Sequence, residues 1–398
     1  MPLERFPIFL MSQLVALGRS GKYSWCFFAL VWLMAIAPAR ASSVELRVAI
    51  KDGVSQVKVG SSTPAVVRDG AYRPLGDLAG MNAFVAQSNR SRIALNRWQS
   101  GQIWIEPREG GYVFIGDRWY RGRTLLVPTA KGLTAINYVD LEQYLYSVLG
   151  GEMNGNWPQE ALKAQAIAAR SYALYKRERA TNKIFDVGDT PTWQVYDGLI
   201  DESAGTQAAV EATKGQVITY KGQIIEAVFH SSAGGCTENV ENVWTQALPY
   251  LRSVKDFDQA SPVFQWTKTF SRSELSQRIP GVGNILSLQP EKMTECGRIV
   301  TMKVIGDRGM RTISGDRLRS ALGLKSTLFR ITSQTTSASG KGKSQGVPVI
   351  FQVNGQGFGH GLGMSQWGAY SLAQQGANYL QILLHYYSST ALAKIQVQ

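Results

Sequence analysis

The residues DLEQYLYSVLGGEM, numbers 140–153, mark the point where the sequence changes from strand to helix patterns. Apolar residues recur there at the spacing of one helix face. Asp140 suits the cap at its start, and Gly150-Gly151 predict its end. Glu152 would then lie just past the helix, where carbonyl groups disfavour negative charge and raise the pKa of a carboxyl. A carboxyl protonated near neutral pH can act as a general acid, and a solvated loop glutamate is the alternative interpretation.

A second helix is predicted over residues 158–180, because Pro158 suits a first helical turn. Lys163 and Arg170 lie in this helix seven residues apart, so both fall on one stripe, roughly 10 Å from each other. Two aligned cations could hold an anionic substrate. The alternative is a solvated helix face.

Strand patterns dominate the sequence before this point. Residues 44–50 alternate with period two, and further short runs are separated by glycines and Pro107. We therefore predict an α+β fold, with a β-rich N-terminal region at 42–135 and a larger domain of mixed helices and antiparallel sheet at 136–398. Within the latter, the low-complexity stretch 334–346 is expected to be a mobile loop.

The first 41 residues resemble a targeting segment. Basic residues precede an apolar run at 25–37, which is short for a membrane span, and Ala39-Arg40-Ala41 suits a cleavage site. We expect export to the periplasm or cell envelope. A cleaved signal peptide is favoured over an uncleaved N-terminal anchor at 1–41.

Composition and missing motifs exclude several classes of function. Lysine and arginine outnumber aspartate and glutamate by 42 to 29, a net charge of +13. This implies acidic partners, and nucleic acid is only one candidate, because an anionic cell-wall polymer or a lipid surface fits equally well. The charges are scattered without interleaved aromatic residues, and we predict no nucleic acid as a partner. The sequence has no Walker A motif, no dinucleotide fingerprint and no H-E-x-x-H. Its 3 histidines argue against a zinc hydrolase with several histidine ligands.

A second glycine-rich stretch, GQGFGHGLG at 355–363, has glycine at every second position. In a strand, this would leave one face bare for a ligand or a close-packed backbone, with His360 on the other face. Tight strand packing alone is the alternative. Ser365 is expected to cap the next helix, with Gln366 exposed in its first turn.

Four blocks together resemble the SpoIID/LytB family of cell-wall proteins. They are YLYSVLGGEM at 144–153, PQEALKAQAIAARSY at 158–172, FHSSAGGCTE at 229–238 and GFGHGLGMSQWGA at 357–369. The resemblance implies a lytic transglycosylase that cleaves peptidoglycan glycan strands stripped of stem peptides, leaving 1,6-anhydro-N-acetylmuramic acid ends. It also implies a cell-wall amidase as functional partner, and a SpoIID/LytB-like catalytic domain at 136–398.

The family's catalytic glutamate falls on Glu152. One such carboxyl is enough for this reaction, because a hydroxyl of the substrate replaces the attacking water. No cofactor is then required. The positions that the resemblance makes candidates for substrate binding are Lys163, Arg170, His360, Ser365 and Gln366.

Some members of the family carry zinc. His230 and Cys236 match two of its ligands, but Gln246 stands where a further cysteine is expected. In an exported protein Cys236 can instead form a disulfide with Cys296. Zinc at His230 and Cys236, and the disulfide, are left as equal alternatives.

Two other functions are alternatives to the lytic transglycosylase. A non-catalytic glycan-binding activator of a cell-wall amidase would fit the family, but has no use for an unpaired Glu152. A hydrolase based on Ser365 and His360 lacks the nucleophile-elbow motif.

Overall fold

The computed structural model describes residues 44–395 except 90, 191, 245 and 336–347. These described residues belong to one compact unit. The predicted signal segment, 1–41, and nearly all of the predicted mobile loop, 334–346, lie outside the described residues. Within the described part, no helix has the length and apolar character needed to cross a membrane. Helices are combined with mainly antiparallel sheets, so the predicted α+β class is confirmed.

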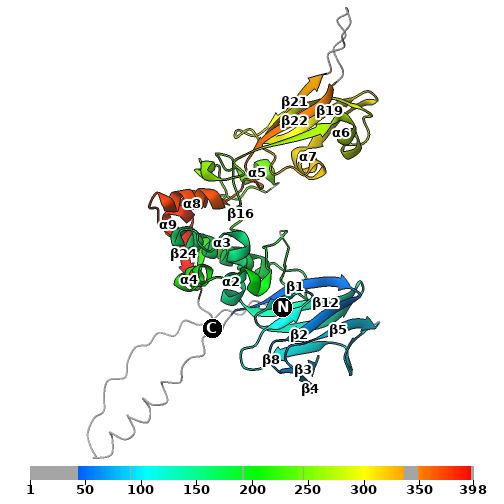
Figure 1. Ribbon diagram of the computed structural model, residues 1–398. Coiled ribbons are helices and arrows are strands. Elements are labelled where there is room, and N and C mark those ends of the chain that lie inside the picture. Colours follow the sequence, from blue (N-terminus) through cyan, green and yellow to red (C-terminus); the bar gives the residue numbers. More distant parts are fainter. Residues whose placement is uncertain (1–43, 90, 191, 245, 336–347, 396–398) are drawn as a thin grey trace, which may run out of the picture. The chain divides into compact units, whose positions relative to one another are not determined.

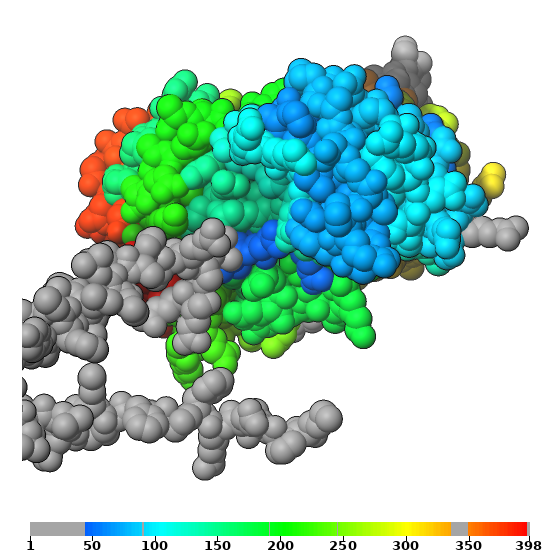
Figure 2. Space-filling view, turned by 90° about the horizontal axis from the view of Figure 1, so that it is seen from below, coloured from blue at the N-terminus to red at the C-terminus, as the bar shows by residue number. Residues whose placement is uncertain are grey.

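The N-terminal region consists of strands in two sheets (Figure 1), and its surface is the blue and cyan face of Figure 2. Its strands are β1 (Glu45–Val54), β2 (Gln56–Ser61), β3 (Ala65–Asp69), β4 (Pro74–Leu78), β5 (Asn82–Asn89), β6 (Arg92–Leu95), β7 (Trp98–Ser100), β8 (Ile103–Pro107), β9 (Val113–Ile115), β10 (Arg118–Tyr120), β11 (Arg123–Thr129) and β12 (Gly132–Asp140). One sheet has the order β1-β12-β11-β8-β3-β4, and the other β10-β9-β2-β5-β6-β7. Apolar side chains of both sheets, such as Val59 and Ile105, are fully buried in one core.

The first sheet also connects this region to the helices. The predicted boundary between 135 and 136 falls inside β12, which pairs along its length with β1. On the other side, β1 pairs with the short strand β13 (Val187–Gly188), which follows the two predicted helices in sequence. The two predicted regions therefore share a sheet.

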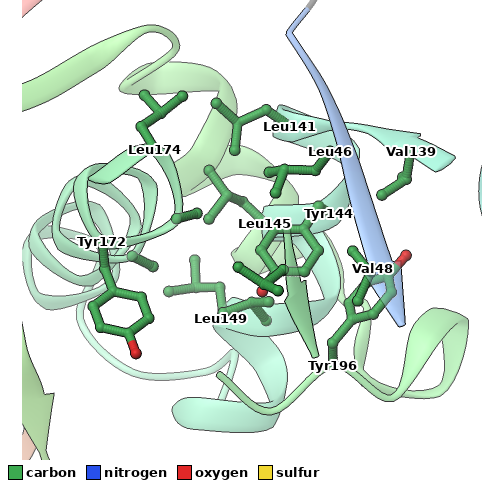
Figure 3. Close-up of a cluster of buried hydrophobic side chains, with 14 of the residues drawn as sticks. Leu46, Val48, Val139, Leu141, Tyr144, Leu145, Leu149, Tyr172, Leu174 and Tyr196 are labelled. Atoms are coloured by element: carbon green, nitrogen blue, oxygen red, sulfur yellow. The ribbon is translucent and has the colours of Figure 1, made fainter. Parts of the chain in front are cut away.

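Both predicted helices are present, as α2 (Leu141–Glu152) and α3 (Gln159–Glu178). Asp140 caps α2 as expected, because its carboxylate accepts hydrogen bonds from the next backbone N–H groups. The apolar face of α2 is fully buried, with Leu145 and Leu149 against α3 and β1 (Figure 3). Each such side chain contributes about 1.5–3 kcal/mol on burial. This packing fixes where the C-terminal end of α2, and hence Glu152, lies.

Residues 265–356 form a lobe with a core of its own, which includes Phe270, Leu288 and Val353. We call it the 265–356 lobe. It contains two three-stranded sheets, β17-β22-β21 and β18-β19-β20. Its elements are β17 (Gln265–Ser271), α6 (Arg272–Arg278), β18 (Ile285–Met293), β19 (Ile299–Gly306), β20 (Gly309–Ser314), α7 (Gly315–Leu322), β21 (Phe329–Thr335) and β22 (Pro348–Gln356).

The remaining elements pack mostly around α3. A hairpin joins the strands Gln216–Tyr220 and Gln223–Ile224, with Lys221 and Gly222 at positive φ as a two-residue turn requires. These elements are η1 (Gly198–Asp201), α4 (Ala204–Ala212), β14 (Gln216–Tyr220), β15 (Gln223–Ile224), β16 (Phe229–His230), α5 (Val240–Val243), η2 (Asp258–Ala260), β23 (Met364–Ser365), α8 (Gln366–Gln374), α9 (Tyr379–Tyr386) and β24 (Ala391–Lys394).

The glycine-rich stretch at 355–363 is not the predicted strand. Strand β22 ends at Gln356, and the four glycines from Gly357 to Gly363 all have positive φ, between 65° and 122°. Such values favour glycine and prevent an extended chain. The close approach that the glycines suggested does occur, because a Cβ on Gly359 would lie 2.6 Å from the Cβ of His230.

Candidate active site

A cavity of about 870 Å³ contains Glu152. It is lined by side chains from α2, α3, α7 and α8 and from the segments 192–195, 226–231 and 358–360. His230, His360 and Gln366 line it together with Glu152, so the structure brings four of the predicted site residues together. A second depression, of about 800 Å³ in the 265–356 lobe, contains none of them.

The two glycines before Glu152 have a different role from the predicted one. They do not end α2, which continues through Glu152. A Cβ on Gly150 would lie 1.8 Å from the carbonyl oxygen of Asp201, and one on Gly151 would lie 2.9 Å from the Val195 side chain. The glycines therefore allow the segment 195–201 to lie directly against the end of the helix.

The same segment supplies a hydrogen bond to the carboxyl of Glu152. The backbone N–H of Val195 donates to Oε1 at 3.1 Å, and the side-chain amide of Gln366 donates to Oε2 at 3.1 Å. No ion pair of a described residue includes Glu152, and its two hydrogen-bond donors are neutral. Burial raises its pKa above the ordinary value, and the two donors offset only part of this effect. The predicted raised pKa is confirmed, with burial as its cause.

Two histidines belong to the lining, with ring centroids 5.2 Å apart. His230 Nδ1 is 3.0 Å from the carbonyl oxygen of Leu362, and the backbone N–H of Leu362 donates to His360 Nδ1 at 3.0 Å. Burial lowers the pKa of His230 well below its ordinary value and that of His360 to about 4. Both rings are therefore neutral at neutral pH.

Gln366 and His230 meet because two short strands pair. In β16 and β23, His230 is the partner of Ser365, and Gln366 follows directly. Ser365 caps α8 as predicted, by accepting a hydrogen bond from the N–H of Gly368 at 3.1 Å. Its side chain is fully buried and does not line the cavity, so the expected contact between Ser365 and substrate is corrected.

The structure also corrects the expected positions of Lys163 and Arg170, neither of which lines the cavity. Arg170 is fully buried, and its guanidinium binds the Glu142 carboxylate at 2.5 Å and the carbonyl oxygen of Gln216 at 3.1 Å. Lys163 forms an ion pair with Glu160 at 2.7 Å. Helix geometry put the two cations on one stripe, but that stripe faces other elements of the fold.

Two other cations line the cavity and were missed from the sequence, Lys176 of α3 and Arg319 of α7. Lys176 forms an ion pair with Glu226, a second carboxylate of the lining. Arg319 comes from the 265–356 lobe, 167 positions after Glu152 in the sequence, and no motif pointed to it. Aromatic side chains complete the walls, among them Trp193, Trp244 and Phe358.

The two cysteines left open by the sequence are joined. Cys236 forms a disulfide with Cys296 of the 265–356 lobe. Its sulfur is therefore not available as a thiolate ligand, although Nε2 of His230 is buried without a hydrogen-bond partner. No three His, Cys, Asp or Glu residues of the described chain are grouped to hold a metal ion. The residues present do not fit the zinc site predicted at His230 and Cys236.

Comparison with known proteins gives the family. The profile described as "Stage II sporulation protein", SpoIID, matches residues 129–220, which include Glu152. Stage II sporulation protein D of Bacillus subtilis is 34% identical over 285 residues, which cover 65% of this chain and 76% of that protein. The chain belongs to the SpoIID/LytB family.

Other relatives of this SpoIID/LytB protein are an uncharacterized protein of Brachyspira hyodysenteriae and the amidase enhancer of Bacillus subtilis. The first is 33% identical over 70% of this chain and 73% of its own length. The second is 32% identical over 62% of this chain but only 40% of its own length. A profile for a domain of unknown function matches residues 235–363, which include the 265–356 lobe. Family membership supports a role connected with the cell wall.

Proposed function

We propose that this protein is a lytic transglycosylase that cleaves peptidoglycan glycan strands, preferably strands stripped of stem peptides. The observation that carries the proposal is Glu152, a carboxyl with a raised pKa in a large cavity, whose hydrogen-bond donors among the described residues are both neutral. A protonated carboxyl in such a place suits a general acid. The exposed aromatic rings of Trp244 and Phe358 suit the apolar faces of sugar rings.

In the proposed reaction, Glu152 protonates the glycosidic oxygen as its bond to C1 of N-acetylmuramic acid breaks. The resulting carboxylate then takes the proton of the C6 hydroxyl of the same sugar, whose oxygen bonds to C1. The ring closure is intramolecular, so no water must be positioned. The product ends in 1,6-anhydro-N-acetylmuramic acid, and Glu152 is protonated again. Gln366 holds the carboxyl oriented, and the reaction requires no cofactor.

The cavity contains a second carboxylate, so hydrolysis must be tested as well. A hydrolase commonly uses a second carboxylate to activate water or to attack C1. Glu226 is paired with Lys176, which makes it less suited to either role. The substrate lies outside the cytoplasmic membrane, so the proposal includes export to the periplasm or envelope and cooperation with an amidase that removes stem peptides.

The test is mass spectrometry of products from purified protein and denuded glycan strands. We expect anhydro ends, about 18 Da lighter than hydrolysed ends, and a loss of about 10²- to 10⁴-fold in rate for Glu152→Gln. Glu226→Gln should cost far less and leave the products unchanged. Hydrated ends that disappear in Glu226→Gln would instead identify a hydrolase.

The relative named amidase enhancer makes a non-catalytic activator the second candidate. In that case, wild type and Glu152→Gln would stimulate an amidase equally, and neither would release glycan fragments. Stimulation that depends on Glu152 would favour the transglycosylase.

A further inference from the structure

The cavity contains one cation whose role in the fold is not evident. Of its two cationic side chains, Lys176 is neutralised by Glu226. The other is Arg319, and no carboxylate oxygen of a described residue lies within the 4.0 Å of an ion pair. Burial lowers the pKa of its guanidinium, and Asp316 opposes this effect only weakly. A cation that is desolvated without a partner is unfavourable unless a ligand supplies the negative charge.

The backbone that carries Arg319 is firmly held. Helix α7 begins at the capping residue Ser314 and ends at Gly323, which has φ 61°. Leu318 and Leu322 bury the other face of the helix in the core of the 265–356 lobe. Nε of Arg319 donates to the carbonyl oxygen of Leu324 at 3.4 Å, which leaves the outer nitrogens of the guanidinium for a ligand. An arginine fork of this kind suits a carboxylate.

The neighbours of Arg319 also favour an anion in the cavity. His230 and His360 are neutral, and the positive charge of Arg319 contributes to lowering the pKa of both. The remaining walls are mostly aromatic and apolar, which strengthens an electrostatic contact by excluding water. An entering carboxylate would thus meet one cation that no carboxylate of the described chain neutralises.

A glycan strand offers such a carboxylate only after its peptides are removed. Each muramic acid carries a lactyl ether whose carboxyl is free in a denuded strand and is an amide in a strand that keeps its stem peptide. We propose that Arg319 binds this lactyl carboxylate and thereby makes the protein select denuded strands. The inference rests on the proposed function, since it takes the same cavity and substrate, and it assigns the 265–356 lobe a part in specificity.

The experiment compares two forms of one substrate, denuded strands with free lactyl carboxyls and the same strands after conversion to methylamides. Arg319→Gln should lower kcat/KM for the free acid by about 10- to 100-fold, the usual size of a charge-assisted hydrogen bond. It should change kcat/KM for the methylamide little. Arg319→Lys should restore part of the difference. The control is Arg317→Gln, on the exposed face of the same helix, which should behave as wild type.

A second readout separates this inference from the proposed function. Binding of both strands is measured in the Glu152→Gln background, where no cleavage is expected, with and without Arg319→Gln. Preference for the free acid that disappears with Arg319→Gln supports the inference even if wild type cleaves nothing, in which case only the catalytic proposal fails. Equal losses on acid and methylamide, or no loss on either, would overturn the role of Arg319 while leaving transglycosylase activity untouched.

Discussion

The two ends of helix α2 carry glutamates in opposite environments. At its start, Glu142 is buried against Arg170 at 2.5 Å and accepts a further hydrogen bond from the N–H of Gly215. At its end, Glu152 lines a cavity, and the hydrogen bonds that it accepts from described residues come from two neutral groups. A spacing of ten positions along one helix therefore separates a carboxylate that the fold neutralises from one that it leaves available.

This difference shows how structural and chemical charges can be told apart. A buried carboxylate that serves the fold is paired, because removing it from water unpaired costs several kcal/mol. A carboxyl that must exchange a proton during a reaction loses its usefulness if a cation holds it ionised. The informative observation is thus that no described residue places a cation in an ion pair with Glu152.

The largest effect on stability is expected at the start of α2, where Glu142 is paired with Arg170. Arg170→Ala leaves the Glu142 carboxylate buried without its cation, which should lower the free energy of unfolding by about 3–5 kcal/mol. Urea unfolding followed by circular dichroism measures this. The rate per folded molecule should change little, because Arg170 does not line the cavity.

The matched control removes both charges. Glu142→Gln with Arg170→Met should recover much of the lost stability, since no unpaired charge remains. If Arg170→Ala instead folded normally and lost activity, the result would support the role in substrate binding that the sequence predicted for Arg170.

The pH dependence of activity is the next test. Glu152 must begin the reaction protonated, so the rate should fall as the pH rises through its raised pKa, by up to tenfold per pH unit. No further change is expected near pH 6.5, because burial keeps His360 neutral down to about 4. Initial rates between pH 4 and 9 test both statements. A rate that rises with pH through 6.5 would place a histidine, not Glu152, at the centre of the reaction.

A smaller effect is expected on the melting temperature when Glu152 itself is replaced. Its folded-state pKa is raised, so the folded protein binds a proton more tightly than the unfolded one, and stability falls as the pH rises through that window. Glu152→Gln removes the cost of burying the charge. The variant should melt about 2 °C above wild type at pH 8 and show no such gain at pH 4. A variant that is less stable at pH 8 would mean that the carboxylate is stabilised by contacts beyond its two neutral donors.

Local features, such as helices and their caps, could be predicted from the sequence better than the way in which distant elements pack against each other. Helices α2 and α3, the cap at Asp140 and the position of Glu152 followed from periodicity and end signals within a few residues. The family motifs added His360 and Gln366. Each of these depends on neighbours in sequence or on residues that a motif marks.

The errors came from long-range packing. Periodicity shows that Lys163 and Arg170 share a stripe, but not which elements cover it. Gly359 and Gly361 have positive φ and pack closely against His230 and Arg298, respectively, which lie far away in sequence. Arg319 lines the cavity because α7 of the 265–356 lobe lies there, although it is 167 positions from Glu152 in the sequence. No local pattern contains this information.

The smallest effect is expected at Lys163, one of the two cations predicted to bind substrate. It forms an i,i+3 ion pair with Glu160, which also accepts a hydrogen bond from the N–H of Tyr379 at the start of α9. Both side chains are partly exposed, and such pairs contribute about 0–1 kcal/mol. Lys163→Ala keeps the helix propensity high, so stability should change by about 0.5 kcal/mol or less. Activity on denuded strands should remain within about twofold of wild type at low and high salt, because the residue is not in the cavity lining. The measurement is the initial rate of Lys163→Ala and of Arg319→Gln, each at low and at high salt. The rate of Arg319→Gln is expected to fall well below that of Lys163→Ala. A salt-dependent loss in Lys163→Ala alone would show that the strand extends beyond the cavity and contacts α3.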